Sequence, residues 1–304
     1  MSASDAFSRR INLNILLTGA SGFLGSAVAR HLQSKGHQVS LLLRPDSKLD
    51  RLQDRAASFN IARPQSDAQL QAFVQSVRPN VLIHTACAYG RQGESTLQLV
   101  DANLRLGISL LQALQSLDYR TVFINTGTAL DKSVNPYAMS KHQLAQWGRL
   151  FATQTGGRLQ WINVVLQHMY GAGDDPSKFT THVLQTCHRN DAVLPLTAGE
   201  QRRDFIYIDD VVSAYETLLS KAAALPDAVD IEVGTGQAPT IREFVETAHR
   251  LTQSKTELRF GAIPYRVNEA MHCQANIDQI RTLGWQPMHS LDTGLQKTIE
   301  LEFA

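Results

Sequence analysis

The chain has 304 residues, of which 43% are hydrophobic and 19% are charged. These values are ordinary for a water-soluble globular protein, and the length allows one large α/β domain or two smaller ones. The formal net charge is +1, and residues of both signs are mixed along the chain. The chain therefore lacks the strongly basic composition of proteins that bind nucleic acid or anionic membranes. No stretch approaches the roughly 18 apolar residues of a membrane span.

Short apolar segments alternate with amphipathic segments through the first half of the chain. We predict strands at Ile15–Leu17, Val39–Leu43, Val81–His84, Thr121–Asn125 and Leu159–Leu166, and helices at Gly25–Ser34, Ala68–Val77, Leu97–Leu117 and Tyr137–Thr153. This alternation is typical of a parallel sheet covered by helices on both faces. Right-handed crossovers then place the carboxyl ends of all the strands at one edge, where ligands bind.

The second half of the chain is less regular. We predict strands at Arg202–Ile208 and Val229–Gly234, and helices at Lys178–His188, Asp209–Ser220 and Thr240–Leu251. Thr240 and Glu243 have the spacing of a capping box. The expected fold is a Rossmann-type doubly wound α/β sheet in residues 1–170, followed by a smaller C-terminal α/β substrate lobe in residues 171–304. Segments near residues 204–236 are expected to return to the main sheet.

A glycine-rich turn follows the first predicted strand. Gly19, Gly22 and Gly25 leave backbone N–H groups open at the start of a helix, as a dinucleotide pyrophosphate requires. Ser21, Phe23 and Leu24 belong to the same turn, so we predict that they also contact the cofactor.

The end of the second strand selects between NAD and NADP(H). Arg44 follows that strand directly, and a guanidinium there accommodates a ribose 2′-phosphate. Asp46 is a mild argument for NAD, but it lies beyond the strand end. We therefore predict NADP(H).

Tyr137 and Lys141 form a Tyr-x-x-x-Lys pair about one helical turn apart. An ammonium beside a phenol lowers its pKa from about 10, so the tyrosine can exchange a proton with a substrate oxygen near neutral pH. A threonine hydroxyl at the end of the preceding strand completes such a site. Thr126 and Thr128 are both candidates, and Thr126 is preferred because it is nearer the strand end.

Further segments carry a family resemblance: Val81–Ala86, Arg203–Val211 and Leu283–Pro287. With the glycine turn and the Tyr–Lys pair, the chain resembles the extended short-chain dehydrogenases/reductases, also called the NAD-dependent epimerase/dehydratase family. Within that family it is most similar to reductases of CDP-linked 4-keto sugars. The resemblance implies NADPH-dependent reduction of the C4 ketone of a nucleotide-linked 4-keto-6-deoxy or 3,6-dideoxy hexose, in deoxysugar or O-antigen-type polysaccharide biosynthesis.

The same resemblance implies roles for individual residues. Tyr137 would protonate the C4 oxygen, Thr126 would hydrogen-bond the ketone, and Lys141 would also hold the nicotinamide ribose. Further cofactor contacts are expected at Asn60, Ile61, Thr85 and Ala86, and substrate contacts at Tyr89, Arg91, Thr126, Phe179, Arg203 and Arg266. The two last-named arginines would grip the diphosphate. A homodimer, formed through the two long helices at 97–117 and 137–153, is also implied. The cysteine spacing and the lack of a membrane-span pattern separately predict a cytoplasmic protein.

Gly127 departs from the family's dehydratases, which carry an Asp-Glu pair after the threonine, so dehydration is not expected. Neither His84 nor His168 has a partner at ligand spacing, and we expect both to pack at strand ends without a metal. The three cysteines are too far apart in the sequence to indicate a zinc site or a disulfide framework. Two alternatives remain open: a nucleotide-sugar 4-epimerase with tightly bound NAD, and a catalytically silent NADP-binding regulator.

Overall fold

A seven-stranded, all-parallel sheet forms the centre of the protein. The computed structural model describes residues 12–53, 55–267 and 269–303, so the first eleven residues of the predicted 1–170 domain lie outside it. The strands follow the order β11-β6-β5-β4-β1-β2-β3. They are β1 (Asn14–Thr18), β2 (Gln38–Leu42), β3 (Asn60–Ala62), β4 (Val81–His84), β5 (Thr121–Thr126), β6 (Leu159–Leu166) and β11 (Ala228–Val233).

Helices cover both faces of this sheet. On one face, α1 (Phe23–Ser34) and α7 (Ile208–Lys221) contribute to the larger hydrophobic core. On the other face, α2 (Asp67–Val77), α4 (Leu106–Gln115) and α5 (Pro136–Gln154) enclose a second core. The predicted doubly wound α/β fold is therefore confirmed, with the strand order reversing between β1 and β4.

The predicted helix over Leu97–Leu117 is not uniform. It consists of α3 (Thr96–Val100), a π-helical turn at Asp101–Arg105 and α4. The π turn carries Asn103, which is fully buried and hydrogen-bonds the backbone of Ala88. A π turn is commonly found where a helix places a side chain for function.

The predicted strand over Arg202–Ile208 is also interrupted. It is divided into β9 (Arg202–Arg203) and β10 (Phe205–Tyr207), which pair with different strands. Between them, the buried Asp204 carboxylate accepts hydrogen bonds from the backbone of Thr235, Gly236 and Ala275. The strand is divided because Asp204 serves as an anchor for two distant segments.

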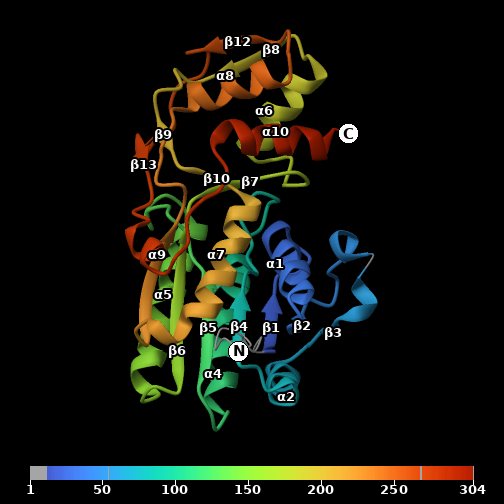
Figure 1. The fold of residues 1–304 in the computed structure, drawn as a ribbon, viewed down its shortest axis with the longest axis vertical. Helices are drawn as coiled ribbons and strands as arrows, with labels where there is room; N and C mark the ends of the chain where they lie inside the picture. The colour runs from blue at the N-terminus through green and yellow to red at the C-terminus, as the bar shows by residue number, and fades with distance from the viewer. Residues whose placement is uncertain (1–11, 54, 268, 304) are drawn as a thin grey trace, which may run out of the picture.

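The sequence analysis predicted α6 and α8 to within about one residue at each end but missed several other elements. Figure 1 shows α6, α8 and α10 together with β8 and β12 above the carboxyl end of the sheet. The remaining elements are β7 (His168–Tyr170), α6 (Phe179–Arg189), β8 (Val193–Leu196), α8 (Ile241–Leu251), β12 (Glu257–Phe260), β13 (His272–Cys273), α9 (Asp278–Thr282), α10 (Leu291–Glu302) and short 3₁₀ turns at Asp50–Leu52, Ala56–Ser58 and Ala222–Ala224. The capping box of Thr240 and Glu243 at the start of α8 is present as predicted.

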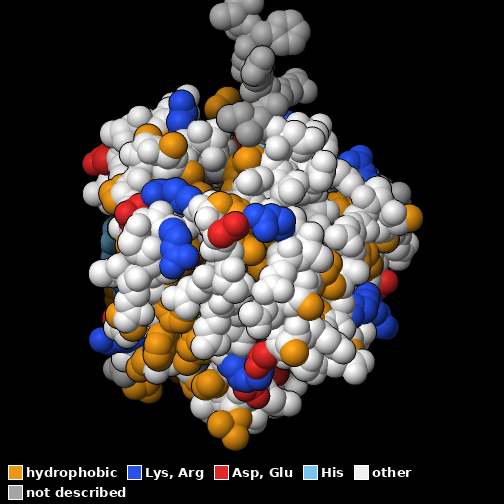
Figure 2. Space-filling model, turned by 90° about the horizontal axis from the view of Figure 1, so that it is seen from below, with side chains coloured by type: hydrophobic (Ala, Val, Ile, Leu, Met, Phe, Trp, Pro, Cys, Tyr) orange, Lys and Arg blue, Asp and Glu red, His pale blue; other side chains and the backbone are white. Residues whose placement is uncertain are grey.

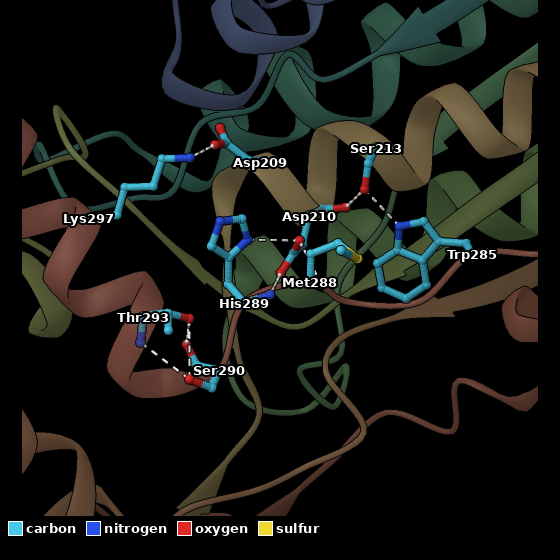
Figure 3. A network of polar contacts seen from close by, with 9 residues as sticks. All are labelled: Asp209, Asp210, Ser213, Trp285, Met288, His289, Ser290, Thr293 and Lys297. Carbon is cyan, nitrogen blue, oxygen red and sulfur yellow. Dashed lines mark hydrogen bonds and ion pairs between the residues drawn. The ribbon is translucent and has the colours of Figure 1, made fainter.

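The segment before α10 is tied to α7 by a buried carboxylate (Figure 3). Asp210 accepts hydrogen bonds of 3.0 Å from the backbone N–H groups of Met288 and His289. Trp285 donates to Ser213 over 2.9 Å, and Lys297 pairs with Asp209. Each of the two segments that the sequence analysis singled out, Arg203–Val211 and Leu283–Pro287, therefore contributes one residue, Asp210 or Trp285, to the contacts between α7 and the segment before α10.

The face seen from below mixes basic and acidic side chains, with hydrophobic side chains gathered toward its lower left (Figure 2). Within residues 12–53, 55–267 and 269–303, none of the helices combines the length and apolar character that crossing a membrane requires.

Candidate active site

The glycine turn lies where the strand order reverses, between β1 and α1. Gly19 has a φ of +79°, and a Cβ atom there would lie 2.5 Å from the backbone nitrogen of Ala86. A Cβ atom at Gly25 would lie 2.1 Å from the carbonyl oxygen of Gly19. Close backbone packing therefore excludes any side chain at these two positions, which is a stronger constraint than a conformational preference for glycine.

The start of α1 is open to an anion. The first turn of the helix contains no acidic residue, and Gly22 provides no side-chain cap for its N–H groups. A helix N-terminus with free N–H groups and uncompensated positive polarity binds phosphate. Ser21, Phe23 and Leu24 belong to this turn, so their predicted positions agree with a pyrophosphate cradle.

Thr85 and Ala86 close the other side of the cradle. The hydroxyl of Thr85 donates to the carbonyl of Thr18 over 2.7 Å, which joins the loop after β4 to the end of β1. The two residues are within contact distance of Gly19. The structure thus brings together the predicted cofactor residues of both loops at the crevice between β1 and β4.

Lys141 lies in the first half of α5 and is only 2% exposed. Its Nζ atom has no hydrogen-bond partner among the described residues. Burial lowers the pKa of Lys141. A buried ammonium requires acceptors, and the two hydroxyls of a nicotinamide ribose are suitable ones. This unpaired atom, together with the glycine cradle, fits a dinucleotide cofactor.

Tyr137 is in the first turn of the same helix, which begins with Asn135 as its side-chain cap and Pro136 at the first position. Its ring lies 4.9 Å from that of Tyr89, centroid to centroid, and its hydroxyl is hydrogen-bonded by Thr128. Burial is the main cause that raises the pKa of Tyr137, with Cys87 the next contributor. The expectation that Lys141 brings this pKa down toward neutrality is wrong here, because the desolvation of the phenolate dominates.

The two candidate threonines face different partners. The hydroxyl of Thr126 shares a hydrogen bond of 2.6 Å with Tyr215 of α7, and both side chains are buried. Thr126 alternates along β5 with Asn125, so it lies on the sheet face that α7 covers. Thr128 lies just beyond the strand, where its side chain reaches Tyr137. The contacts of the structure therefore favour Thr128 over the predicted Thr126.

Two residues that the sequence analysis did not assign to the site support it. Asn103 hydrogen-bonds both Ala88 and Ser140, so it fixes the loop after β4 against α5. The Cys87 thiol shares a hydrogen bond with the hydroxyl of Tyr89. The helical pattern of residues 97–117 contains no signal for the π turn that carries Asn103, so the sequence offered no means of finding it.

Cationic side chains gather around Tyr89 and His168. The guanidinium of Arg91 lies 5.5 Å from the Tyr89 ring, and the ammonium of Lys178, which also pairs with Asp174 over 2.9 Å, lies 5.9 Å from it. Burial, together with Arg203, Lys178 and Arg91, lowers the pKa of His168 to about 4. Three cationic side chains thus lie around one half-buried ring, which makes this region suitable for an anionic ligand.

The other predicted substrate residues differ in their exposure to solvent. Arg203 is buried and forms an ion pair with Glu269, whereas Arg266 is exposed. Phe179 begins α6, with its ring 6.0 Å from that of Phe244. The buried Arg203 guanidinium therefore already has a carboxylate partner, whereas Arg266 forms no such ion pair within the described residues.

Arg44 follows β2, and its Nε atom lies 3.8 Å from Asp46 Oδ1. Its side chain is nevertheless 74% exposed, so the rest of the guanidinium is accessible to a phosphate. Arg63 donates to the carbonyls of Arg44 and Pro45 and brings a second cation to the same loop. On the edge strand β3, Asn60 hydrogen-bonds Ser40, whereas Ile61 packs against the larger core. The side chains of these two residues therefore face opposite sides of the sheet.

Known proteins resemble this chain over nearly its whole length. The CDP-abequose synthase of Salmonella typhimurium is 27% identical, over 94% of this chain and 97% of its own. The CDP-abequose synthase of Salmonella muenchen is 28% identical, over 96% of this chain and 99% of its own. The structure of UDP-glucose 4-epimerase from Thermus thermophilus in complex with NAD is similar with a TM-score of 0.80. It is 19% identical, and the match covers 94% of this chain and 98% of that one.

A family model also matches residues 15–234, which include the glycine turn, the Tyr137–Lys141 pair and all seven strands of the sheet except the first residue of β1. The chain therefore belongs to the NAD dependent epimerase/dehydratase family.

Proposed function

We propose that this protein reduces the C4 ketone of a nucleotide-linked 4-keto-6-deoxy or 3,6-dideoxy hexose with NADPH, in deoxysugar biosynthesis. The observation that carries the proposal is the pair of Tyr137, still protonated, and Lys141, whose buried ammonium is unpaired among the described residues. The relatives named CDP-abequose synthase, which match nearly the whole chain, support a CDP-linked sugar as substrate.

Tyr137 is the proton donor in this proposal. Because burial raises its pKa, the phenol keeps its proton at neutral pH and can give it to the C4 oxygen, which becomes a hydroxyl. The O–H bond of the tyrosine breaks as the new O–H bond forms. Lys141 then stabilises the phenolate until a proton from solvent restores it. When bound, NADPH supplies the hydride that reduces the carbon.

Thr128 orients the ketone in this scheme. Its side chain is hydrogen-bonded to Tyr137, so one oxygen of the substrate can reach both hydroxyls. Thr126, preferred from the sequence, supports the site from the opposite face of the sheet through Tyr215.

Arg44 and Arg63 are the proposed contacts of the ribose 2′-phosphate, because a guanidinium binds phosphate with two parallel hydrogen bonds. Lys178, Arg91 and Arg203 are the proposed contacts of the nucleotide diphosphate, since all three charges act on the same residue, His168. Tyr89, whose ring lies beside Tyr137, is proposed to contact the sugar.

The test is NADPH oxidation by the purified protein with CDP-, dTDP- and GDP-linked 4-keto-6-deoxy sugars, with products identified by NMR. We expect turnover with at least one of them, and a loss of about 10²–10⁴-fold in Tyr137→Phe. In Arg44→Ala, the KM for NADPH should rise while the KM for NADH stays unchanged. The absence of turnover with every sugar would refute the reductase.

A nucleotide-sugar 4-epimerase is the second candidate, because the similar Thermus thermophilus enzyme is one. Such an enzyme would purify with NAD(H) visible in its absorbance spectrum and would interconvert two C4 epimers without consuming NADPH. A protein that purifies without bound nucleotide and consumes NADPH in proportion to product is instead the reductase.

We also infer a homodimer formed through α3 and α5. Three apolar side chains on α5 are 40–45% exposed, and Leu97 of α3 is 75% exposed; those on α5 are Met139, Trp147 and Leu150. The three α5 positions are spaced so that they share one side of the helix. A second copy of this chain would bury them.

A further inference from the structure

A row of polar side chains crosses five strands of the sheet just below the candidate site. Thr18, His84, Asn125, Asn163 and Asp230 are successive register partners on β1, β4, β5, β6 and β11. Residues opposite one another in a sheet point to the same face. The row therefore lies on the face that α4 and α5 cover, which is also the face of Leu82 and Phe123.

Hydrogen bonds connect most of this row. Thr18 and His84 share a hydrogen bond of 2.7 Å between the hydroxyl and Nδ1. Asn125 Nδ2 donates to Asn163 Oδ1 over 2.7 Å, and Asn163 Nδ2 donates to Asp230 Oδ1 over 3.0 Å. At the exposed end, Asp230 forms an ion pair with Arg149 of α5.

Gly127 is required for this arrangement. A Cβ atom at that position would lie 2.7 Å from Asn163 Oδ1, closer than side chains approach one another. Gly127 stands where the dehydratases of the family carry an acidic residue. Its lack of a side chain therefore also leaves room for the amide of Asn163.

The two amides have the same orientation. Each donates toward Asp230 and turns its oxygen toward β4, so the negative ends of both dipoles point away from the carboxylate and toward the site. Asn125 Oδ1 is buried and has no hydrogen-bond partner among the described residues, and the same holds for His84 Nε2 and Lys141 Nζ. On one face of the sheet, a buried acceptor and a buried ammonium thus both lack a partner within the described part of the chain.

Lys141 lies close to this end of the row. Burial lowers the pKa of His84 to about 3, and the charge of Lys141 acts in the same direction, so the ammonium is near the imidazole. His84 is the register partner of Asn125. The His84 ring therefore has the Asn125 amide beside it on the sheet and the Lys141 ammonium within range of its electrostatic effect.

We propose that Asn125 is a positioning residue for Lys141: its Oδ1, oriented by the Asn125–Asn163–Asp230 row, directs the negative end of the amide dipole toward the ammonium and holds it charged on the side of α5 that carries Tyr137. The row offsets the unfavourable burial of the charge by supplying a dipole that is fixed at its other end. Asp230 and Arg149 anchor the row at the surface.

The groups that face Lys141 come from several elements. They are His84 of β4, Cys87 of the loop that follows, and Tyr137 one turn earlier on α5; the π turn contributes the uncharged Asn103, next to Ser140. The nearby thiol of Cys87 raises the pKa of Lys141, opposing burial. In the described part of the chain, Asn125 Oδ1 is a carbonyl acceptor without a hydrogen-bond partner, and it lies on the face of the sheet that α5 covers.

The inference rests on the proposed function only for the catalytic role of Lys141, so the test observes the lysine directly. The pKa of Lys141 is measured by NMR titration of the full chain carrying isotope-labelled lysine, with and without NADPH, and its signal is assigned with Lys141→Arg. Loss of this dipole destabilises the charged form, so Asn125→Leu should lower this pKa and Asp230→Asn should lower it less. Asn125→Asp should raise it.

Asp227→Asn is the matched control, because Asp227 is also exposed, precedes β11 and pairs with Arg120 outside the row. It should leave the titration of Lys141 unchanged. NADPH affinity, measured by fluorescence, should fall about tenfold in Asn125→Leu and remain unchanged in the control. Asp230→Asn changes only a surface side chain, so it remains informative even where Asn125→Leu fails to fold.

Identical titration of Lys141 in the wild type, Asn125→Asp and Asp230→Asn would overturn the proposal. Failure of the reductase itself would look different. The row would still shift the pKa of Lys141, while no 4-keto sugar would be reduced.

Discussion

Thr126 and Thr128 are two residues apart, yet their side chains have different partners and predict different consequences of mutation. Thr126 and Tyr215 satisfy one another inside the core, whereas Thr128 reaches the hydroxyl of Tyr137. A hydroxyl that touches the reacting tyrosine affects the rate, and a hydroxyl that pairs with a buried phenol affects stability.

Replacing each threonine by the isosteric valine separates these roles. We expect Thr128→Val to lower kcat by about 10²-fold, as expected for loss of one hydroxyl that orients the carbonyl oxygen in the transition state. Thr126→Val should keep most of the activity but lose about 1–3 kcal/mol of stability, because the Tyr215 hydroxyl is left buried and unpaired. Steady-state kinetics and chemical denaturation of both variants give the answer. The reverse pattern would identify Thr126 as the catalytic hydroxyl.

Among the elements, two carboxylates add to the strand pairing that holds the segments from the last third of the chain. Asp204 accepts from the backbone of three distant residues, and Asp210 does the same for the segment that leads into α10. Asp204 lies between β9 and β10, and Asp210 lies in the first turn of α7. These anchors bring α10 and the loop before it over the carboxyl edge of the sheet.

Asp209 and Asp210 provide a matched pair for testing this. Asp210 is 1% exposed and accepts two backbone N–H groups, so Asp210→Ala should destabilise the fold by about 2–4 kcal/mol. The Asp209 side chain is 52% exposed and pairs with Lys297, so Asp209→Ala should change stability by less than about 1 kcal/mol. Urea unfolding measures both, and equal losses would contradict the anchoring role of Asp210.

For the molecule as a whole, the exposed apolar side of α5 requires an explanation. Met139, Trp147 and Leu150 share one side of this helix while its other side packs on the sheet. The same helix carries Tyr137 and Lys141 at its N-terminal end. Contact with a second copy would therefore also hold the catalytic helix in place.

Light scattering coupled to size-exclusion chromatography tests the dimer. The wild type should have twice the mass of one chain, and Leu150→Glu should have the mass of one, because a buried unpaired carboxylate opposes association. Val267→Glu is the control: Val267 is 91% exposed and lies outside α5, so this variant should remain a dimer. A monomeric wild type at micromolar concentration would refute the inferred homodimer.

The hydrophobic periodicity of the sequence was sufficient to predict most of the central sheet and its helices. The strands Val81–His84 and Leu159–Leu166 have the predicted bounds, because both belong to the regular alternation of apolar and amphipathic segments in the first half of the chain. The short strands β7, β8, β12 and β13 were missed because they have only two to four residues and lie in the less regular second half. The π turn was missed because one inserted residue hardly disturbs a helical pattern.

The doubly wound fold, the glycine cradle and the Tyr137–Lys141 pair could all be predicted from the sequence, because each depends on local spacing along the chain. Three features required the folded chain: which threonine reaches Tyr137, the pairing of Arg203 with Glu269, and a pKa of Tyr137 that is raised rather than lowered. The polar row from Thr18 to Asp230 likewise became visible only in the folded protein. These features depend on strand register, on the face of the sheet and on burial, which arise when distant segments pack together.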